Sequence, residues 1–219
     1  MPDWVLAAER AYVAAAVGKR SADPRALLEA APGIASPSSS ALPPGSALPS
    51  GSGKPDRQAR AIAAAGAVAS RFLAVGTPRS FGIVIDVATE VEAAALSLVA
   101  HRTWFDPRDI RCAATHGGAD ELAAATGGRV VSVDEALACD VVNIYSTRAR
   151  VTPAQLRRGT HVNAGSADRF DPELLELATV VHDAGLPALA AGLVDGRQLD
   201  ELTIFLADGA PIAAAADRA

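Results

Sequence analysis

The sequence predicts an α/β fold in which helices cover both faces of a parallel sheet. From Phe81 onward, short β-branched runs alternate with helical stretches, which is typical of βαβ units. The first of these runs, Phe81–Asp86, is almost continuously apolar, as expected of a parallel strand that is buried on both faces. Half of the composition is hydrophobic and only 4% is aromatic, which suits closely packed helices and strands. We therefore expect a Rossmann-like, doubly wound sheet.

The segments before the first strand differ in composition. Trp4–Val17 places apolar residues on one helical face, and Pro24–Ala30 can form a second short helix. Pro32–Pro55 consists mainly of Ser, Pro and Gly, which predicts a linker or a disordered loop. Arg57–Ala74 is an alanine-rich helix. The expected parts are an N-terminal helical segment at 1–31, a linker at 32–56 and a Rossmann-like domain at 57–219.

The domain alternates strands with helices. The expected strands are Phe81–Asp86, Ile110–Thr115, Arg129–Ser132, Val141–Tyr145, His161–Ala164 and Val180–His182. The expected helices are Thr89–Ala100, Ala119–Ala125, Asp134–Ala138, Thr152–Arg157 and Pro172–Leu177. The tail adds a further apolar segment at Leu202–Ala210. The crossovers between parallel strands should be right-handed.

The bulk composition excludes several classes of function. The net charge is −5 and the chain has no basic stripe, so nucleic acid is not an expected partner. No apolar run approaches the ~18 residues of a membrane span, and no signal peptide precedes the first helix. Cys112 and Cys139 lack metal-ligand spacing and are expected as buried, reduced thiols. We expect a cytoplasmic protein without a metal site or a G-x-S-x-G nucleophile.

The first candidate site is the junction after the first strand, Ile85–Glu90. Dinucleotide-binding folds carry glycines here, so that the backbone can approach a pyrophosphate at the helix N-terminus. This chain has branched side chains instead, with two carboxylates, Asp86 and Glu90. Asp86 could cap the following helix. Two interpretations remain open: a dinucleotide bound in the usual pose, or a Rossmann-like domain without this ligand.

The second candidate site follows the second strand. An acidic residue at this place usually holds the ribose hydroxyls of a dinucleotide. The chain has His116 followed by Gly117 and Gly118. His116 could contact a phosphorylated ribose, or it could be a turn residue beside two glycines. Asp120 is expected in the first turn of the next helix, where a carboxylate is favourable.

The run Gly159–Asp168, read as G-T-H-V-N-A-G-S-A-D, is the most specific motif in the chain. It resembles the G-T-H-V-N-A-x-G-A-D stretch of the ornithine cyclodeaminase/mu-crystallin family. Further segments resemble the helices and strands of that family. They are Trp4–Val17, Ala61–Ala74, Asp140–Thr147, Asp171–Leu175, Val180–Asp183 and Leu202–Ile212. The resemblance covers nearly the whole chain.

The resemblance implies an NAD(P)-dependent reaction that interconverts amino and imino acids, or a cyclisation of ornithine with loss of ammonia. It implies a cofactor on the Rossmann domain, a separate domain that binds substrate and dimerises, and proton transfer by Asp168. A small amino or imino acid is the implied ligand. The cleft at the carboxyl ends of the strands should be lined, besides Asp168, by Asp86, Thr89, His116, Ser146, Thr147, Asn163 and Ser166.

The chain departs from the family pattern at three places. The glycine fingerprint falls on Ile85, Val87 and Glu90. The arginine that grips the substrate carboxylate falls on Ala61, and the neighbouring Arg60 points about 100° away on a helix. The Pro/Ser/Gly stretch stands where the family has the sheet of its substrate domain, so the N-terminal helical segment is a reduced version of that domain.

These departures leave two hypotheses. The first is a degenerate protein that has lost the ancestral reaction and acts as a partner or interaction subunit, either in a homo-oligomer or with an intact family paralogue. The second is a repurposed or divergent enzyme, of the cyclodeaminase or imino acid reductase type, in which Asp168 is the acid/base group.

Overall fold

The computed structural model describes residues 4–10, 57–182 and 202–207. The predicted second helix and the linker fall outside these residues, as does the later part of the predicted first helix. Within the described part, residues 4–10 form a helix as predicted.

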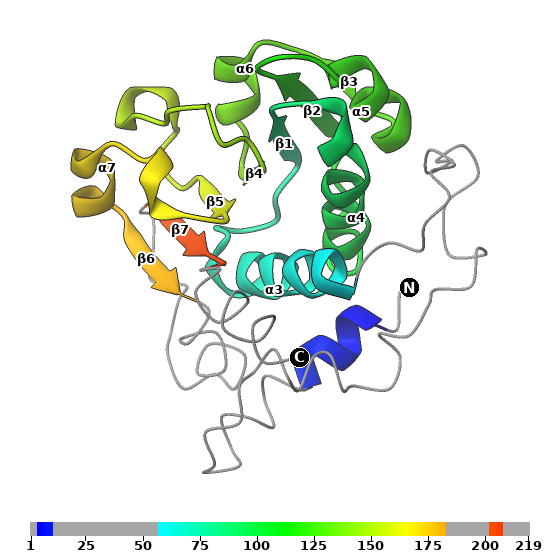
Figure 1. Cartoon of the computed structure of the whole chain (residues 1–219). Helices are drawn as coiled ribbons and strands as arrows, with labels where there is room; N and C mark the ends of the chain where they lie inside the picture. Colours follow the sequence, from blue (N-terminus) through cyan, green and yellow to red (C-terminus); the bar gives the residue numbers. More distant parts are fainter. Residues whose placement is uncertain (1–3, 11–56, 183–201, 208–219) are drawn as a thin grey trace, which may run out of the picture.

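The seven strands within the described residues form one parallel sheet in the order β3-β2-β1-β4-β5-β7-β6 (Figure 1). Their bounds are β1 Ser80–Ile85, β2 Asp109–Ala114, β3 Arg129–Val130, β4 Val141–Ile144, β5 His161–Ala164, β6 Thr179–His182 and β7 Thr203–Leu206. The strand order reverses between β1 and β4, which are hydrogen-bonded neighbours. In open α/β sheets, ligands bind beyond the carboxyl ends of the strands at such a switch point.

Helices cover both faces of the sheet, as a doubly wound fold requires. The α-helices are α3 Arg57–Leu73, α4 Val91–His101, α5 Ala119–Thr126, α6 Val133–Leu137 and α7 Pro172–Leu177. Short 3₁₀ turns are η2 Ala88–Glu90, η3 Pro153–Gln155 and η4 Ala167–Arg169. One face of the sheet packs on α3, α4 and α5, and the other packs on α6 and α7. The predicted α/β, Rossmann-like architecture is confirmed.

The one glycine inside β1 is explained by a close approach. A Cβ atom at Gly82 would lie 1.9 Å from the carbonyl oxygen of Ala136 in α6. On the opposite face of β1, the fully buried Phe81, Ile83 and Ile85 pack against α4 and α5. β1 is therefore held tightly between two layers, and this fixes the position of the residue that follows it.

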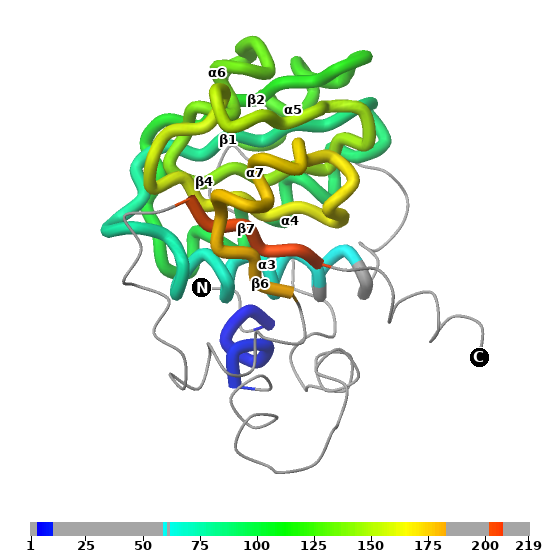
Figure 2. The backbone as a smooth tube through the Cα atoms, turned by 90° about the vertical axis from the view of Figure 1, so that its left-hand side faces the viewer, coloured from blue at the N-terminus to red at the C-terminus, as the bar shows by residue number. Residues whose placement is uncertain are grey.

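The structure corrects the predicted elements in two places. Each predicted strand is present with ends that move by at most two residues, but Thr152–Arg157 forms only the 3₁₀ turn η3. The apolar tail contributes β7, which is inserted between β5 and β6 (Figure 1, Figure 2). Four of its residues are buried in the sheet, so this late segment completes the core around β5.

Candidate functional site

Asp86 lies directly after β1, at the switch point of the sheet, and only 4% of the residue is exposed. Its carboxylate accepts hydrogen bonds from the hydroxyls of Thr115 at 2.6 Å and Thr147 at 2.7 Å. It also accepts from the backbone amide of Thr147 at 2.6 Å and from the hydroxyl of Ser146. The donors follow β2 and β4, so one carboxylate ties together the ends of three adjacent strands.

The charged form of Asp86 is strongly favoured. Burial by itself would raise the pKa of Asp86, but the hydroxyls of Ser146, Thr115 and Thr147, with the Thr147 amide, hold that pKa well below its ordinary value. A carboxylate that accepts several hydrogen bonds stays ionised at any physiological pH. The switch point thus contains a fixed negative charge.

Glu90 reaches back to the same point. Its carboxylate accepts a hydrogen bond from the backbone amide of Asp86 at 2.6 Å. The prediction that Asp86 could cap the following helix is wrong. The N-cap position of η2 is Val87, and no side chain caps this turn. The carboxylate of Asp86 instead accepts hydrogen bonds from residues that follow the neighbouring strands. Glu90 is the last residue of the 3₁₀ turn η2 and lies four residues after Asp86, whose backbone amide it binds.

Two loops close against each other beside Asp86. Gly118 has a φ of 92°, and a Cβ atom there would lie 2.7 Å from the backbone nitrogen of Ala88. His116, expected at a ribose, is exposed and lies 3.2 Å from the Thr115 hydroxyl. Thr89 is exposed on η2. The structure therefore brings Asp86, Ser146 and Thr147 together, but leaves His116 and Thr89 outside this cluster.

Asp168 lies in the 3₁₀ turn η4, after β5, and its side chain is exposed. Its backbone amide donates to the hydroxyl of Ser166 at 3.3 Å, so Ser166 caps this turn. Asp120 lies in the first turn of α5, as predicted. Arg60 is 3% exposed, burial lowers its pKa, and the negative charge of Glu92 in α4 partly offsets that effect.

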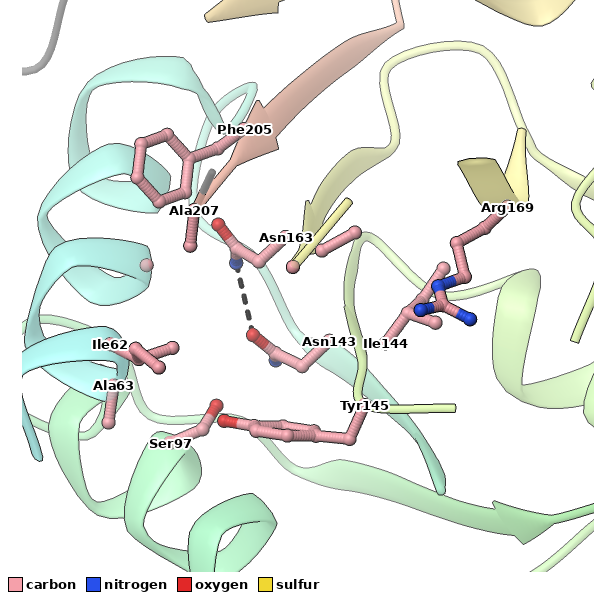
Figure 3. Close-up of a pocket in the computed structure, with 13 residues that line it drawn as sticks. Ile62, Ala63, Ser97, Asn143, Ile144, Tyr145, Asn163, Arg169, Phe205 and Ala207 are labelled. Carbon is pink, nitrogen blue, oxygen red and sulfur yellow. Dashed lines mark hydrogen bonds between the residues drawn. The ribbon is translucent and has the colours of Figure 1, made fainter. Parts of the chain in front are cut away.

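A cavity of about 150 Å³ lies between α3, α4 and the carboxyl ends of β4, β5 and β7 (Figure 3). Its polar lining consists of Ser97, Asn143, Tyr145, Asn163 and Arg169. Of the predicted cleft residues only Asn163 lines it. The signal that sequence reasoning missed is a pair of asparagines inside apolar strands: Asn143 and Asn163 are direct neighbours in the register of β4 and β5.

A fully buried hydrogen-bond network lies beneath the cavity. The amide nitrogen of Asn163 donates to the hydroxyl of Ser70 at 2.9 Å and to Oδ1 of Asn143 at 3.0 Å. Oδ1 of Asn163 lies 3.0 Å from Nε2 of His161. Ser70 in turn lies 2.8 Å from Nε2 of His101, whose Nδ1 is 2.7 Å from the carbonyl oxygen of Ser97. The network joins α3, α4, β4 and β5.

Burial keeps the groups of this network uncharged. It lowers the pKa of His101 to about 4 and that of His161 to about 3, although the hydrogen bonds that the two rings donate to the carbonyl oxygen of Ser97 and to Oδ1 of Asn163 partly offset it. Burial also raises the pKa of Tyr145 to about 12, against the opposing effect of the Ser97 hydroxyl beside it (Figure 3). Both imidazoles and the phenol are therefore neutral at pH 7.

The described residues contain no group of histidine, cysteine and carboxylate side chains that could hold a metal ion. None of the helices within residues 4–10, 57–182 and 202–207 is long and apolar enough to cross a membrane.

No family model and no curated protein matches this sequence. Solved structures do match it. An archaeal alanine dehydrogenase dimer with bound NAD is 24% identical, with 68% of this chain and 58% of that chain covered and a TM-score of 0.58. The Δ1-pyrroline-2-carboxylate reductase of Thermococcus litoralis, in complex with NADH and L-proline, is 20% identical, with 69% and 59% covered and a TM-score of 0.58.

A probable ornithine cyclodeaminase from Bordetella pertussis Tohama I is 19% identical, with 71% of this chain and 63% of that chain covered and a TM-score of 0.53. The chain thus spans less than two thirds of the length of each of these structures. At this level of identity the likeness establishes the fold. The fold that the resemblance to the ornithine cyclodeaminase/mu-crystallin family implies is therefore confirmed.

Proposed function

We propose that this chain does not hold NAD(P) in the usual pose, has lost the amino/imino acid redox reaction, and acts as a partner subunit. The observation that supports the proposal is the carboxylate of Asp86 at the switch point. Its hydrogen bonds use the donors of Thr115, Ser146 and Thr147. These groups follow β2 and β4, beside the switch point at which open α/β sheets bind their ligands.

A pyrophosphate needs free backbone amides and a favourable field. Here the amides of Asp86 and Thr147 are already donated to the carboxylates of Glu90 and Asp86. The ionised carboxylate of Asp86 would also repel a diphosphate in this buried place, where charges are screened little. The residues present do not fit the cofactor at this position, so no step of a reaction is derived through it.

The proposal is tested by isothermal titration of the purified full chain with NADH and NADPH. We expect no saturable binding up to millimolar nucleotide. The matched variant is Glu90→Gln, which removes one charge but leaves the Asp86 cluster in place and should not restore binding. Micromolar binding of either nucleotide to the unaltered chain would overturn the proposal.

A second copy of this chain or a full-length paralogue is the proposed partner. The archaeal alanine dehydrogenase is described as a dimer, which supports a homodimer. Light scattering during size-exclusion chromatography measures the mass, and we expect about twice the 22.2 kDa of one chain. A monomer that stays monomeric with every paralogue would contradict the partner role. The free, buried thiols of Cys112 and Cys139 support the proposed cytoplasmic location.

The cavity favours a second candidate, a repurposed enzyme that handles a small amino or imino acid. Asp168 directly precedes Arg169, which lines that cavity, and an exposed carboxylate there could exchange a proton with a bound molecule. Turnover of Δ1-pyrroline-2-carboxylate with NADPH would favour this candidate. Asp168→Asn should then lower kcat at least about 100-fold, and Asp171→Asn, which changes only a helix cap, should not.

A further inference from the structure

The outer face of α7 carries two carboxylates and an exposed leucine. Glu176 and Leu177 lie three and four positions after Glu173, so the three side chains share one face of the helix. All three are exposed, whereas Leu174 is fully buried in the core beneath α7. Leu177 is 59% exposed, more than any other large apolar residue in the part of the chain that the structure describes. A single exposed leucine is ordinary on a protein surface, so its meaning depends on its neighbours.

The loop that follows β4 carries the opposite charge. Arg148 and Arg150 are both exposed. Ala149 and Val151, which alternate with them along the chain, are buried in the same core as the inner face of α7. Because buried and exposed residues alternate, both arginine side chains face away from that core. Residues 145–152 include no aspartate or glutamate, so this stretch is purely basic.

The basic loop and α7 lie next to each other. Val151 forms an isolated parallel bridge with Phe170, and its amide donates to the carbonyl oxygen of Arg169 at 2.9 Å. The amide of Asp171 donates in turn to the carbonyl oxygen of Val151 at 2.9 Å, and Asp171 is the N-cap residue of α7. The basic loop is therefore joined to the amino end of the helix whose outer face is acidic.

The two groups of charges are not paired with each other within one chain. The ion pairs within residues 4–10, 57–182 and 202–207 join Arg71 to Glu9, and both Arg111 and Arg129 to Asp109. None of these pairs involves an arginine of the loop after β4 or a carboxylate of α7. Both groups thus stay available to a binding partner of complementary charge.

A surface with a basic part beside an acidic part is complementary to itself. When a two-fold axis relates two copies, the basic part of each copy meets the acidic part of the other. We infer that this surface is the interface between two copies of this chain. The two arginines of the loop in one protomer face the two carboxylates of α7 in its partner, and the aliphatic stems of those arginines cover the exposed leucine. The inference rests on the proposed homo-oligomer and specifies its contact surface.

The test uses two charge-reversed full chains. One chain carries Glu173→Arg with Glu176→Arg, and the other carries Arg148→Glu with Arg150→Glu. A dimer of either chain with itself would place like charges across the interface, so we expect each to dimerise at least about tenfold more weakly than the unaltered chain. An equal mixture places opposite charges at both contacts, so we expect a heterodimer with about the affinity of the unaltered dimer. Light scattering during size-exclusion chromatography gives the mass, and an affinity tag on one chain identifies the heterodimer.

Two control experiments make this test specific. Asp120→Arg with Glu121→Arg reverses two exposed carboxylates in α5 and should leave the dimer unchanged. Leu177→Ser should weaken the dimer at least about tenfold through lost apolar burial in both copies. Val130→Ser, at a 48% exposed valine of β3 on the opposite edge of the sheet, should not weaken it.

The possible outcomes separate this interface from the homo-oligomer itself. A heterodimer that forms only from the mixture would support the inference. Dimers that persist in both charge-reversed chains, or a mixture that stays monomeric, would overturn the interface but leave the homo-oligomer in place. An unaltered chain that is monomeric would overturn both.

Discussion

Two polar clusters lie at the carboxyl ends of the strands, and they differ in how their hydrogen bonds end. Around Asp86, the hydroxyls of Thr115, Ser146 and Thr147 and the backbone amide of Thr147 all donate to one carboxylate, so these donors are used within the cluster. Around Asn163, a chain of hydrogen bonds runs through neutral groups and ends at an unused donor of Asn143. Folds of this type usually bind their ligands at the switch point. In this chain the donors at that point are used by Asp86, and the unpartnered donor belongs to Asn143 in β4.

The difference between an ionised and a neutral cluster should be visible in the acid dependence of stability. Since burial lowers the pKa values of His101 and His161 to about 4 and 3, both histidines stabilise the fold above their unfolded pKa of ~6.5 and lose that contribution as the pH falls. At pH 5, about 1.5 units below that unfolded pKa, the free energy of unfolding has fallen by about 2 kcal/mol for each histidine. Asp86 has a lowered pKa in the folded chain, so its contribution to stability is lost only as the pH falls below the unfolded pKa of ~4.

Urea unfolding at a series of pH values separates the two. In His161→Gln the loss between pH 7 and pH 5 should shrink by about half, because one of two titrating imidazoles is gone. Asp86→Asn should leave the loss in this window unchanged. A pH profile that is flat from 7 to 5 would show that the histidines are not held neutral.

The closed cluster itself can be broken with Asp86→Ala. The substitution leaves the hydroxyls of Thr115, Ser146 and Thr147 and one amide without their acceptor, and we expect a loss of about 3 kcal/mol in the free energy of unfolding. Asp120→Ala, an exposed carboxylate in the first turn of α5, is the control and should cost less than about 1 kcal/mol. Similar losses in both variants would mean that the Asp86 hydrogen bonds contribute little.

The packing of the two loops beside Asp86 gives a smaller effect. Gly118→Ala forces a Cβ atom to 2.7 Å from the backbone of Ala88, whereas a Cβ atom at Gly117 meets nothing within 4 Å. Both glycines have positive φ values, so the difference between the two alanine variants isolates the contact. We expect Gly118→Ala to lower the free energy of unfolding by about 2 kcal/mol more than Gly117→Ala does, and so to melt at a lower temperature. Equal melting temperatures would indicate that these loops are not closed against each other.

The fold could be predicted from the sequence because it depends on periodic apolar patterns, such as those of β1 and β5. The position of β7 could not be predicted, because this strand is short and is inserted between β5 and β6, which come earlier in the chain. Asp86 was identified as the residue that disturbs the phosphate loop, but its partners after β2 and β4 depend on the twist and register of three strands.

The cavity was harder to predict than the switch point. Asn163 was expected in a cleft, whereas Asn143 lies within an apolar strand, where a single polar residue carries no motif. Its importance comes from the register that places it beside Asn163 and from the helices that bury both residues. Asp168 was proposed for its motif alone, and its catalytic role stays a prediction.

The most direct test of a closed switch point is the carbon chemical shift of the Asp86 carboxyl group, followed by NMR from pH 7 to pH 3 with and without NADH. We predict that the carboxyl stays ionised well below the ordinary aspartate pKa of ~3.9, and that millimolar NADH leaves its shift unchanged. Ordinary titration near pH 4, together with a saturable shift on adding NADH, would contradict the account and return the dinucleotide to this site.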